Sequence, residues 1–123
     1  MQILVVDDDP LAAEMVGAVL QELGHHVLLA ENAMEAISQL NEHPSIEMVI
    51  SDMNMPLISG IDLFRELREQ GNALPFILLT GDDPDKLRTI EPRLGACVLK
   101  DFHLDSTLPA AMTQARTATT TSE

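Results

Sequence analysis

Five polar side chains of this sequence stand at the ends of apolar segments, where strands of a sheet are expected to stop. They are Asp7, Asp8, Asp52, Thr80 and Lys100. Carboxylates held within a few ångströms repel one another, and each is driven to bind a proton unless a cation compensates. Mg²⁺ prefers oxygen ligands and takes one or two protein carboxylates together with water and phosphate oxygens. A hydroxyl and an ammonium are suited to neutralising phosphoryl oxygens. If the fold gathers these groups, their types predict attack by a carboxylate on a phosphoryl group.

The elements that must position these residues alternate between apolar strands and amphipathic helices. This alternation is typical of a parallel sheet covered on both faces. The predicted strands are residues 3–6, 26–30, 46–51, 76–79 and 96–99. Five strand–helix units in 123 residues predict an open, doubly wound α/β sheet, whose ligands bind outside the carboxyl ends of the strands. The five polar residues are therefore expected in one crevice, with strand 26–30 at an edge of the sheet.

Capping residues indicate where the helices begin. The expected N-caps are Asp9, Asn32, Ser59 and Asp83. The first helix is expected to bury an apolar stripe of Leu11, Met15, Val16, Val19, Leu20 and Leu23. Pro109 predicts that the last helix begins near Ser106, because a proline in the first turn costs no bonded N–H. Residues 1–117 form one predicted domain, and the threonine-rich residues 118–123 a polar tail or the start of a linker.

The composition limits the classes of partner. The chain carries 7 basic and 20 acidic residues, a formal net charge of -13. This charge repels nucleic acid and anionic lipid and favours cations and basic patches on partner proteins. The longest apolar stretch is far shorter than the ~20 residues of a membrane span. With no apolar leader and with Cys97 as the single cysteine, the sequence predicts a cytoplasmic protein that binds neither nucleic acid nor membrane.

Four stretches of the sequence together resemble the response-regulator receiver domains of two-component signalling. They are ILVVDDDP from Ile3, VISDMNMPLISG from Val49, ILLTG from Ile77 and VLKD from Val98. They occur in family order and span nearly the whole chain. The resemblance implies a flavodoxin-like, three-layer αβα sandwich with a five-stranded parallel sheet in the order 2-1-3-4-5. It also implies a phosphoacceptor rather than an enzyme, with self-catalysed phosphorylation and dephosphorylation.

The resemblance assigns roles to individual residues. Asp52 is the expected phosphoacceptor, and Asp8, Asp52 and the backbone carbonyl of Asn54 are expected to ligate Mg²⁺. Asp7 is expected to act on the ion mainly through water. Thr80 is expected to bond the phosphoryl group and move with it, and Lys100 to pair with the phosphoryl oxygens. Pro56 and Gly60 are expected to shape the loop after Asp52. Asn54 and Asp82 are expected to tune hydrolysis of the acyl phosphate. Thr80 and Cys97 occupy the expected switch positions.

The implied phosphodonor is a sensor histidine kinase or a phosphotransfer protein, while the output partner stays open. Whether phosphorylation drives dimerisation stays open as well. One departure from the family concerns Cys97, because receivers usually have an aromatic switch residue three positions before the lysine. The aromatic switch is thus in question here.

Two other functions fit parts of the sequence. An aspartate-nucleophile phosphatase of the haloacid dehalogenase type also places Asp-x-Asp and Thr-Gly after strands. That family requires an acidic pair at the end of a further strand after the lysine, and it leaves Asp52 without a role. A pseudo-receiver, an interaction module that never carries phosphate, is favoured by the missing aromatic and opposed by the complete acidic set.

Overall fold

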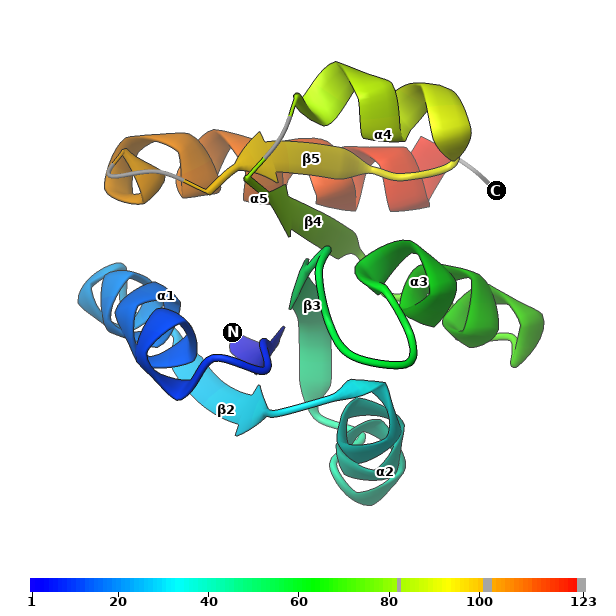
Figure 1. The fold of residues 1–123 in the computed structure, drawn as a ribbon. Coiled ribbons are helices and arrows are strands. Elements are labelled where there is room, and N and C mark those ends of the chain that lie inside the picture. Colours follow the sequence, from blue (N-terminus) through cyan, green and yellow to red (C-terminus); the bar gives the residue numbers. More distant parts are fainter. Residues whose placement is uncertain (82, 101–102, 122–123) are drawn as a thin grey trace.

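The computed structural model describes residues 1–81, 83–100 and 103–121. Strands and helices alternate along the chain (Figure 1). In order they are β1 (Gln2–Val6), α1 (Pro10–Glu22), β2 (His26–Ala30), α2 (Ala33–Glu42), β3 (Ile46–Asp52), α3 (Gly60–Glu69), β4 (Phe76–Thr80), α4 (Pro84–Ile90), β5 (Ala96–Leu99) and α5 (Leu104–Thr121). The five predicted strands are confirmed.

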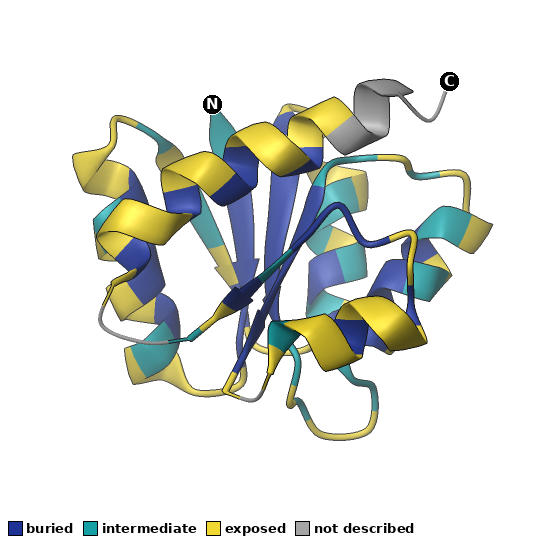
Figure 2. Cartoon of the chain, turned by 90° about the horizontal axis from the view of Figure 1, so that it is seen from above, coloured by how far each residue is buried: buried dark blue, intermediate teal, exposed yellow. Residues whose placement is uncertain are grey.

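The strands form one parallel sheet in the order β2-β1-β3-β4-β5, as the resemblance implied. Two hydrophobic clusters lie on its opposite faces. One joins the strands to α1 and α5, and the other joins them to α2, α3 and α4. Figure 2 shows the central strands as a buried layer between helices that keep one face exposed. The fold is therefore the expected three-layer sandwich.

The predicted capping residues begin their helices. The Asp9 carboxylate accepts a hydrogen bond from Leu11 N at 3.0 Å, and Pro10 occupies the first turn of α1. At α3, the Ser59 hydroxyl accepts from Asp62 N at 3.2 Å, and the Asp62 carboxylate accepts from Ser59 N at 3.3 Å. Such bonds satisfy N–H groups that a helix start leaves without partners. Asn32 and Asp83 cap α2 and α4 in the same way.

The apolar stripe predicted for α1 is wrong in part. Leu11 is 72% exposed and Met15 is 61% exposed. The residues that α1 buries are Ala13, Val16, Gly17 and Leu20. Small residues let the helix lie close to the sheet, since a Cβ at Gly17 would be 3.5 Å from Val27 Cγ1. The larger side chains at the margin of the stripe are left outside this contact.

The predicted start of the last helix is also wrong. Helix α5 begins at Leu104, so Pro109 lies inside the helix rather than in its first turn. The earlier start buries Leu104 in the same cluster as Leu108. Burial of a leucine contributes about 1.5–3 kcal/mol, which can offset the single hydrogen bond that Pro109 removes. The helix continues to Thr121, past the domain boundary predicted at residue 117; the division into domain and tail stays a prediction.

Candidate functional site

Parallel pairing brings the carboxyl ends of the central strands together. Asp52 is the last residue of β3 and pairs with Leu79, next to Thr80 at the end of β4. Backbone bonds continue the alignment beyond the strands: Met53 N donates to Leu79 O at 2.8 Å, and Lys100 N donates to Thr80 O at 2.7 Å. The sheet thus places the residues that follow these strands at one edge, as the sequence predicted.

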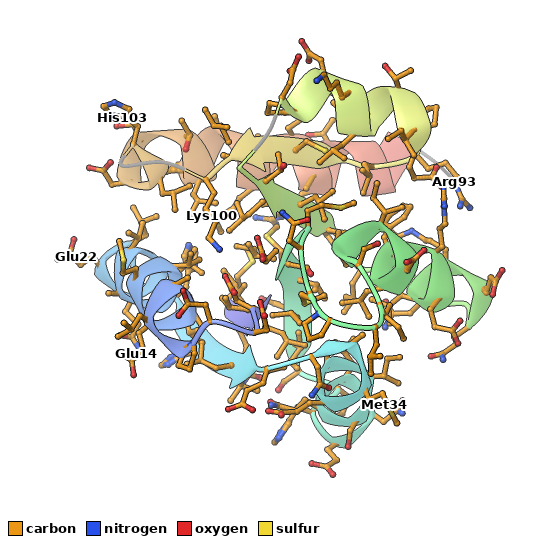
Figure 3. The ribbon with its side chains drawn as sticks, viewed as in Figure 1. Glu14, Glu22, Met34, Arg93, Lys100 and His103 are labelled. Carbon is orange, nitrogen blue, oxygen red and sulfur yellow. The ribbon has the colours of Figure 1, made fainter. Side chains whose placement is uncertain are left out.

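The Lys100 ammonium joins two buried carboxylates at this edge. Its Nζ lies 2.6 Å from Asp7 Oδ2 and 3.3 Å from Asp52 Oδ1. Figure 3 shows the Lys100 side chain reaching from the end of β5 toward the centre of the molecule. The other oxygen of Asp7 accepts from Asp9 N at 2.9 Å. Both carboxylates are buried, at 3% exposure for Asp7 and 7% for Asp52.

Burial and charge act in opposite directions on the two ionisable groups. Burial raises the pKa of Asp52, the nearby Asp7 charge raises it further, and Lys100 offsets only part of this. Burial lowers the pKa of Lys100, but hydrogen bonds and attraction to Asp7 and Asp52 outweigh it and leave the pKa raised. The lysine is therefore a stable cation, whereas ionised Asp52 lacks full compensation. Additional positive charge at this place would stabilise the carboxylate.

The acidic residues form a donor set suited to a hard cation. Asp7, Asp8 and Asp52 each offer a carboxylate oxygen, and these atoms lie within 4.8 Å of one another. Asp8 is exposed, while the other two are buried, so the set opens toward solvent on one side. Oxygen donors and the raised Asp52 pKa fit Mg²⁺, which retains water and phosphate oxygens in its shell. The residues present therefore fit the predicted ion.

The loop between β3 and α3 is held close to Asp52. Gly60 N donates to Met53 O at 2.9 Å, which folds the loop back toward the strand. A Cβ at Gly60 would lie 2.5 Å from Asp52 O and 2.5 Å from Leu78 Cδ1. Only glycine fits this contact without displacing its neighbours. The structure thus gives a physical reason for the predicted role of Gly60 in shaping the loop, in which Asn54 and Pro56 are exposed.

Comparison with known proteins decides the family. The protein-family model described as "Response regulator receiver domain" matches residues 3–112 of the chain. The chain belongs to the receiver-domain family. This receiver domain is 34% identical over 107 residues to the two-component response regulator PhoP of Pseudomonas aeruginosa, covering 85% of this chain and 47% of that protein. It is also 34% identical over 107 residues to the sensor histidine kinase RcsC of Escherichia coli, covering 85% of this chain and 11% of that protein. The chain spans less than half the length of both relatives.

Solved receiver domains have the same fold. A receiver domain from Clostridium thermocellum superposes with a TM-score of 0.83 at 27% identity, covering 99% of this chain and 98% of that one. Response regulator protein TrrA from Thermotoga maritima, solved in complex with Mg²⁺-BeF, gives a TM-score of 0.81 at 31% identity, covering 92% and 97% of the two chains.

Thr80 and Cys97 of this receiver domain lie on β4 and β5, the two neighbouring strands at one side of the sheet. Thr80 is buried at the end of β4, and Cys97 on β5 pairs with Leu78 and is half-buried. Burial raises the pKa of the Cys97 thiol to about 11, so the thiol is uncharged at neutral pH. The role of Cys97 as a switch position stays a prediction. Asp82, predicted to tune the site, lies outside the described residues.

Sequence reasoning missed two features of the receiver domain. Buried Glu91, the C-cap of α4, accepts from Arg65 Nε at 3.0 Å and from two Arg93 nitrogens at 3.0 Å. We call these three side chains the Glu91 cluster. Its only signal in the sequence was that Glu91 and Arg93 are two positions apart. The second feature is the backbone of Leu57, whose φ is 70°. Leucine rarely adopts a positive φ, so its residue type gave no reason to expect one here.

The described strands bear on the phosphatase alternative. In the described residues β5 is the last strand and is followed by α5, so the further strand with an acidic pair that this alternative requires is not found there. None of the described helices is long and apolar enough to cross a membrane.

Proposed function

We propose that this receiver domain accepts a phosphoryl group on Asp52 in a Mg²⁺-dependent transfer. The donor is a phosphohistidine on a sensor kinase or phosphotransfer protein, or a small donor such as acetyl phosphate. One observation carries the proposal: buried Asp52 has a raised pKa, lies among the oxygens of Asp7 and Asp8, and is 3.3 Å from the Lys100 ammonium. An anionic nucleophile surrounded by cations is what phosphoryl transfer requires.

The transfer is a displacement at phosphorus. A carboxylate oxygen of Asp52 forms the new P–O bond, the P–N bond to the donor imidazole breaks, and the imidazole leaves. Lys100 neutralises charge on the phosphoryl oxygens, and the Thr80 hydroxyl donates a hydrogen bond to one of them. Asp8, Asp52 and the carbonyl of Asn54 would hold Mg²⁺, with Asp7 acting through water. When bound, the ion supplies further positive charge for the phosphoryl oxygens.

Signal output and signal loss use residues around the same site. Thr80 moves toward the phosphoryl group, and α4, β5 and α5 repack in response, a change between two packings worth a few kcal/mol. Cys97 lies on β5 within that region. Hydrolysis of the acyl phosphate ends the signal, at a rate tuned by Asn54 and Asp82. The donor protein docks over the exposed part of α1 near Leu11 and Met15 and over the loop around Pro56.

Labelling with a small donor tests the proposal without a partner protein. Acetyl phosphate and Mg²⁺ should add one phosphoryl group to the wild type and none to Asp52→Asn. Asp105→Asn removes an exposed carboxylate in the first turn of α5 and should label like the wild type. Chelation of Mg²⁺ should abolish labelling. Equal labelling of wild type and Asp52→Asn would remove Asp52 from its role.

A further inference from the structure

The most exposed large apolar side chains lie in segments that follow the carboxyl ends of strands. Among the described residues, the four largest exposures belong to Leu57, Met34, Leu11 and Met15. Leu11 and Met15 lie on α1, Met34 lies in the first turn of α2, and Leu57 lies in the loop between β3 and α3. These segments therefore begin at the edge of the sheet that carries Asp52, and Leu57 and the start of α1 follow the two central strands β3 and β1.

Leu57 is the extreme case in both exposure and backbone conformation. Its exposed fraction is 102%, so its side chain contacts almost nothing in the folded chain. Its φ of 70° is the one positive value at a non-glycine residue in the part of the chain that the structure describes. Ile58 N donates to Pro56 O at 2.8 Å, which makes Leu57 the central residue of a tight three-residue turn. A positive φ in such a turn is strained for an L-residue with a branched side chain.

The folded domain does not require leucine at this position. Glycine or asparagine adopts positive φ with less strain, and a polar side chain is better hydrated than a fully exposed leucine. Strain and apolar exposure at one residue beside a functional site point to a use outside the folded chain. The neighbouring bond from Gly60 N to Met53 O fixes the base of the loop beside Asp52, so Leu57 is held at a defined place.

We propose that Leu57 is the apolar anchor through which the phosphohistidine-bearing donor protein docks. This inference rests on the proposed function. Figure 1 shows α1 and the loop between β3 and α3 on opposite sides of the end of β3, so a donor that reaches Asp52 from solvent meets both. Leu57 then enters an apolar hollow beside the donor histidine, while Leu11 and Met15 contact the donor across the crevice. The strained turn presents the leucine in its bound position, which reduces the ordering cost of docking.

A comparison of two donors isolates docking from chemistry. Each variant is phosphorylated by acetyl phosphate and by the fastest donor in a panel of autophosphorylated sensor kinases. The measured quantity is the ratio of the rate with the kinase, below saturation, to the rate with acetyl phosphate. Leu57→Asn tolerates positive φ but is polar, and it should lower this ratio about tenfold, the factor that corresponds to about 1.4 kcal/mol. Leu57→Met keeps an apolar side chain and should stay close to the wild type.

Two controls complete the design. Leu23→Asn removes a partly exposed leucine at the C-cap of α1, the far end of the helix from the crevice, and should leave the ratio unchanged. The melting temperature of Leu57→Asn should not fall below that of the wild type, because the substitution relieves strain and removes no packing.

The outcomes separate this inference from the proposed function. A lower ratio of the kinase rate to the acetyl phosphate rate in Leu57→Asn, with wild-type ratios in Leu57→Met and Leu23→Asn, supports the anchor. An unchanged ratio in Leu57→Asn overturns it, as does failure of every kinase in the panel to phosphorylate a wild type that acetyl phosphate labels. A wild type that acetyl phosphate does not label overturns the proposed function, and the anchor with it.

Discussion

The Lys100 ammonium lies 2.6 Å from Asp7 Oδ2, closer than its 3.3 Å distance from Asp52 Oδ1. The lysine therefore contacts two carboxylates at once, one that follows β1 and one at the end of β3, and its single positive charge offsets only part of their combined negative charge. It also leaves Asp52 with the weaker of the two contacts. The nucleophile that we propose is thus the carboxylate with more of its charge uncompensated, which is the condition under which it gains most from a bound dication.

Removal of the Lys100 charge should destabilise the domain. In Lys100→Met, Asp7 and Asp52 remain buried without a positive partner, and the free energy of unfolding in chelator should fall by about 2 kcal/mol. This is below the 3–5 kcal/mol typical of a broken buried pair, because the Lys100 side chain is 26% exposed and water reaches the site. Urea denaturation measures it. Mg²⁺ should restore part of the loss, and an unaltered midpoint in chelator would contradict the assigned electrostatic role.

Asp52→Asn should raise the free energy of unfolding in the absence of divalent ions. Since the pKa of Asp52 is raised above its ordinary 3.8, the folded state holds that proton to higher pH than the unfolded state. Ionisation of Asp52 therefore costs stability, and the cost grows as pH rises through the acidic range and is complete above the folded pKa. The advantage of Asp52→Asn should thus be present at neutral pH and shrink as pH falls toward 3.8.

Magnesium provides the control for this pH dependence. The wild type should be stabilised by Mg²⁺ more than Asp52→Asn, because the ion binds the folded state and compensates a charge that the variant lacks. Thermal unfolding of the wild type and of Asp52→Asn, each with and without Mg²⁺ and at several pH values, measures the four stabilities that this comparison needs. Equal stabilisation of the two proteins by Mg²⁺ would mean that Asp52 does not take part in binding the ion.

Gly60→Ala should destabilise the domain and slow its labelling. The added Cβ would lie 2.5 Å from Asp52 O, so either strand β3 or the loop must shift. Overpacking of this kind costs about 1–3 kcal/mol, and displacement of the Asp52 backbone should lower the rate with acetyl phosphate. Gly81→Ala is the matched control for stability, since a Cβ there meets nothing within 4 Å. Equal denaturation midpoints for Gly60→Ala and Gly81→Ala would contradict the close contact between Gly60 and the Asp52 backbone.

Glu91→Gln should weaken the domain at neutral pH but not in strong acid. Hydrogen bonds from Arg93, with a further one from Arg65, lower the pKa of Glu91 from 4.5 to about 2 against the effect of burial. A carboxyl with a lowered pKa contributes stability above its ordinary pKa and loses it as pH falls. The contribution should be about 1–2 kcal/mol, reduced because Arg93 is 60% exposed. The difference between wild type and variant should be full at pH 7 and should decline between pH 4.5 and pH 2. A double-mutant cycle with Arg93→Met measures the interaction energy between Glu91 and Arg93 directly. If the effects of the two substitutions on the free energy of unfolding simply add, the assigned interaction is contradicted.

Local sequence signals predicted the elements and the edge of the sheet that carries the site. Asp9 with Pro10 and Ser59 with Asp62 make their bonds within a few residues, so their sequence spacing was sufficient. Convergence of Asp7, Asp52 and Lys100 followed from parallel strand order, since the ends of adjacent strands meet at one edge.

Features that depend on tertiary contact could not be read in the same way. Pro109 was predicted to start a helix, but burial of Leu104 extends that helix toward the N-terminus. Leu11 and Met15 fit a helical apolar stripe, yet the sheet contacts the smaller residues of α1 instead. The Glu91 cluster joins α3 to the end of α4 through residues 26 positions apart, which no local pattern encodes.

Chemical trapping of the acyl phosphate tests the phosphoacceptor most directly. Borohydride reduces an aspartyl phosphate to homoserine, and peptide mass mapping then locates the converted residue. After incubation with acetyl phosphate and Mg²⁺, the account predicts homoserine at position 52 and nowhere else. Homoserine at position 7 or 8, or a labelled protein that yields none at position 52, would contradict the assignment of Asp52.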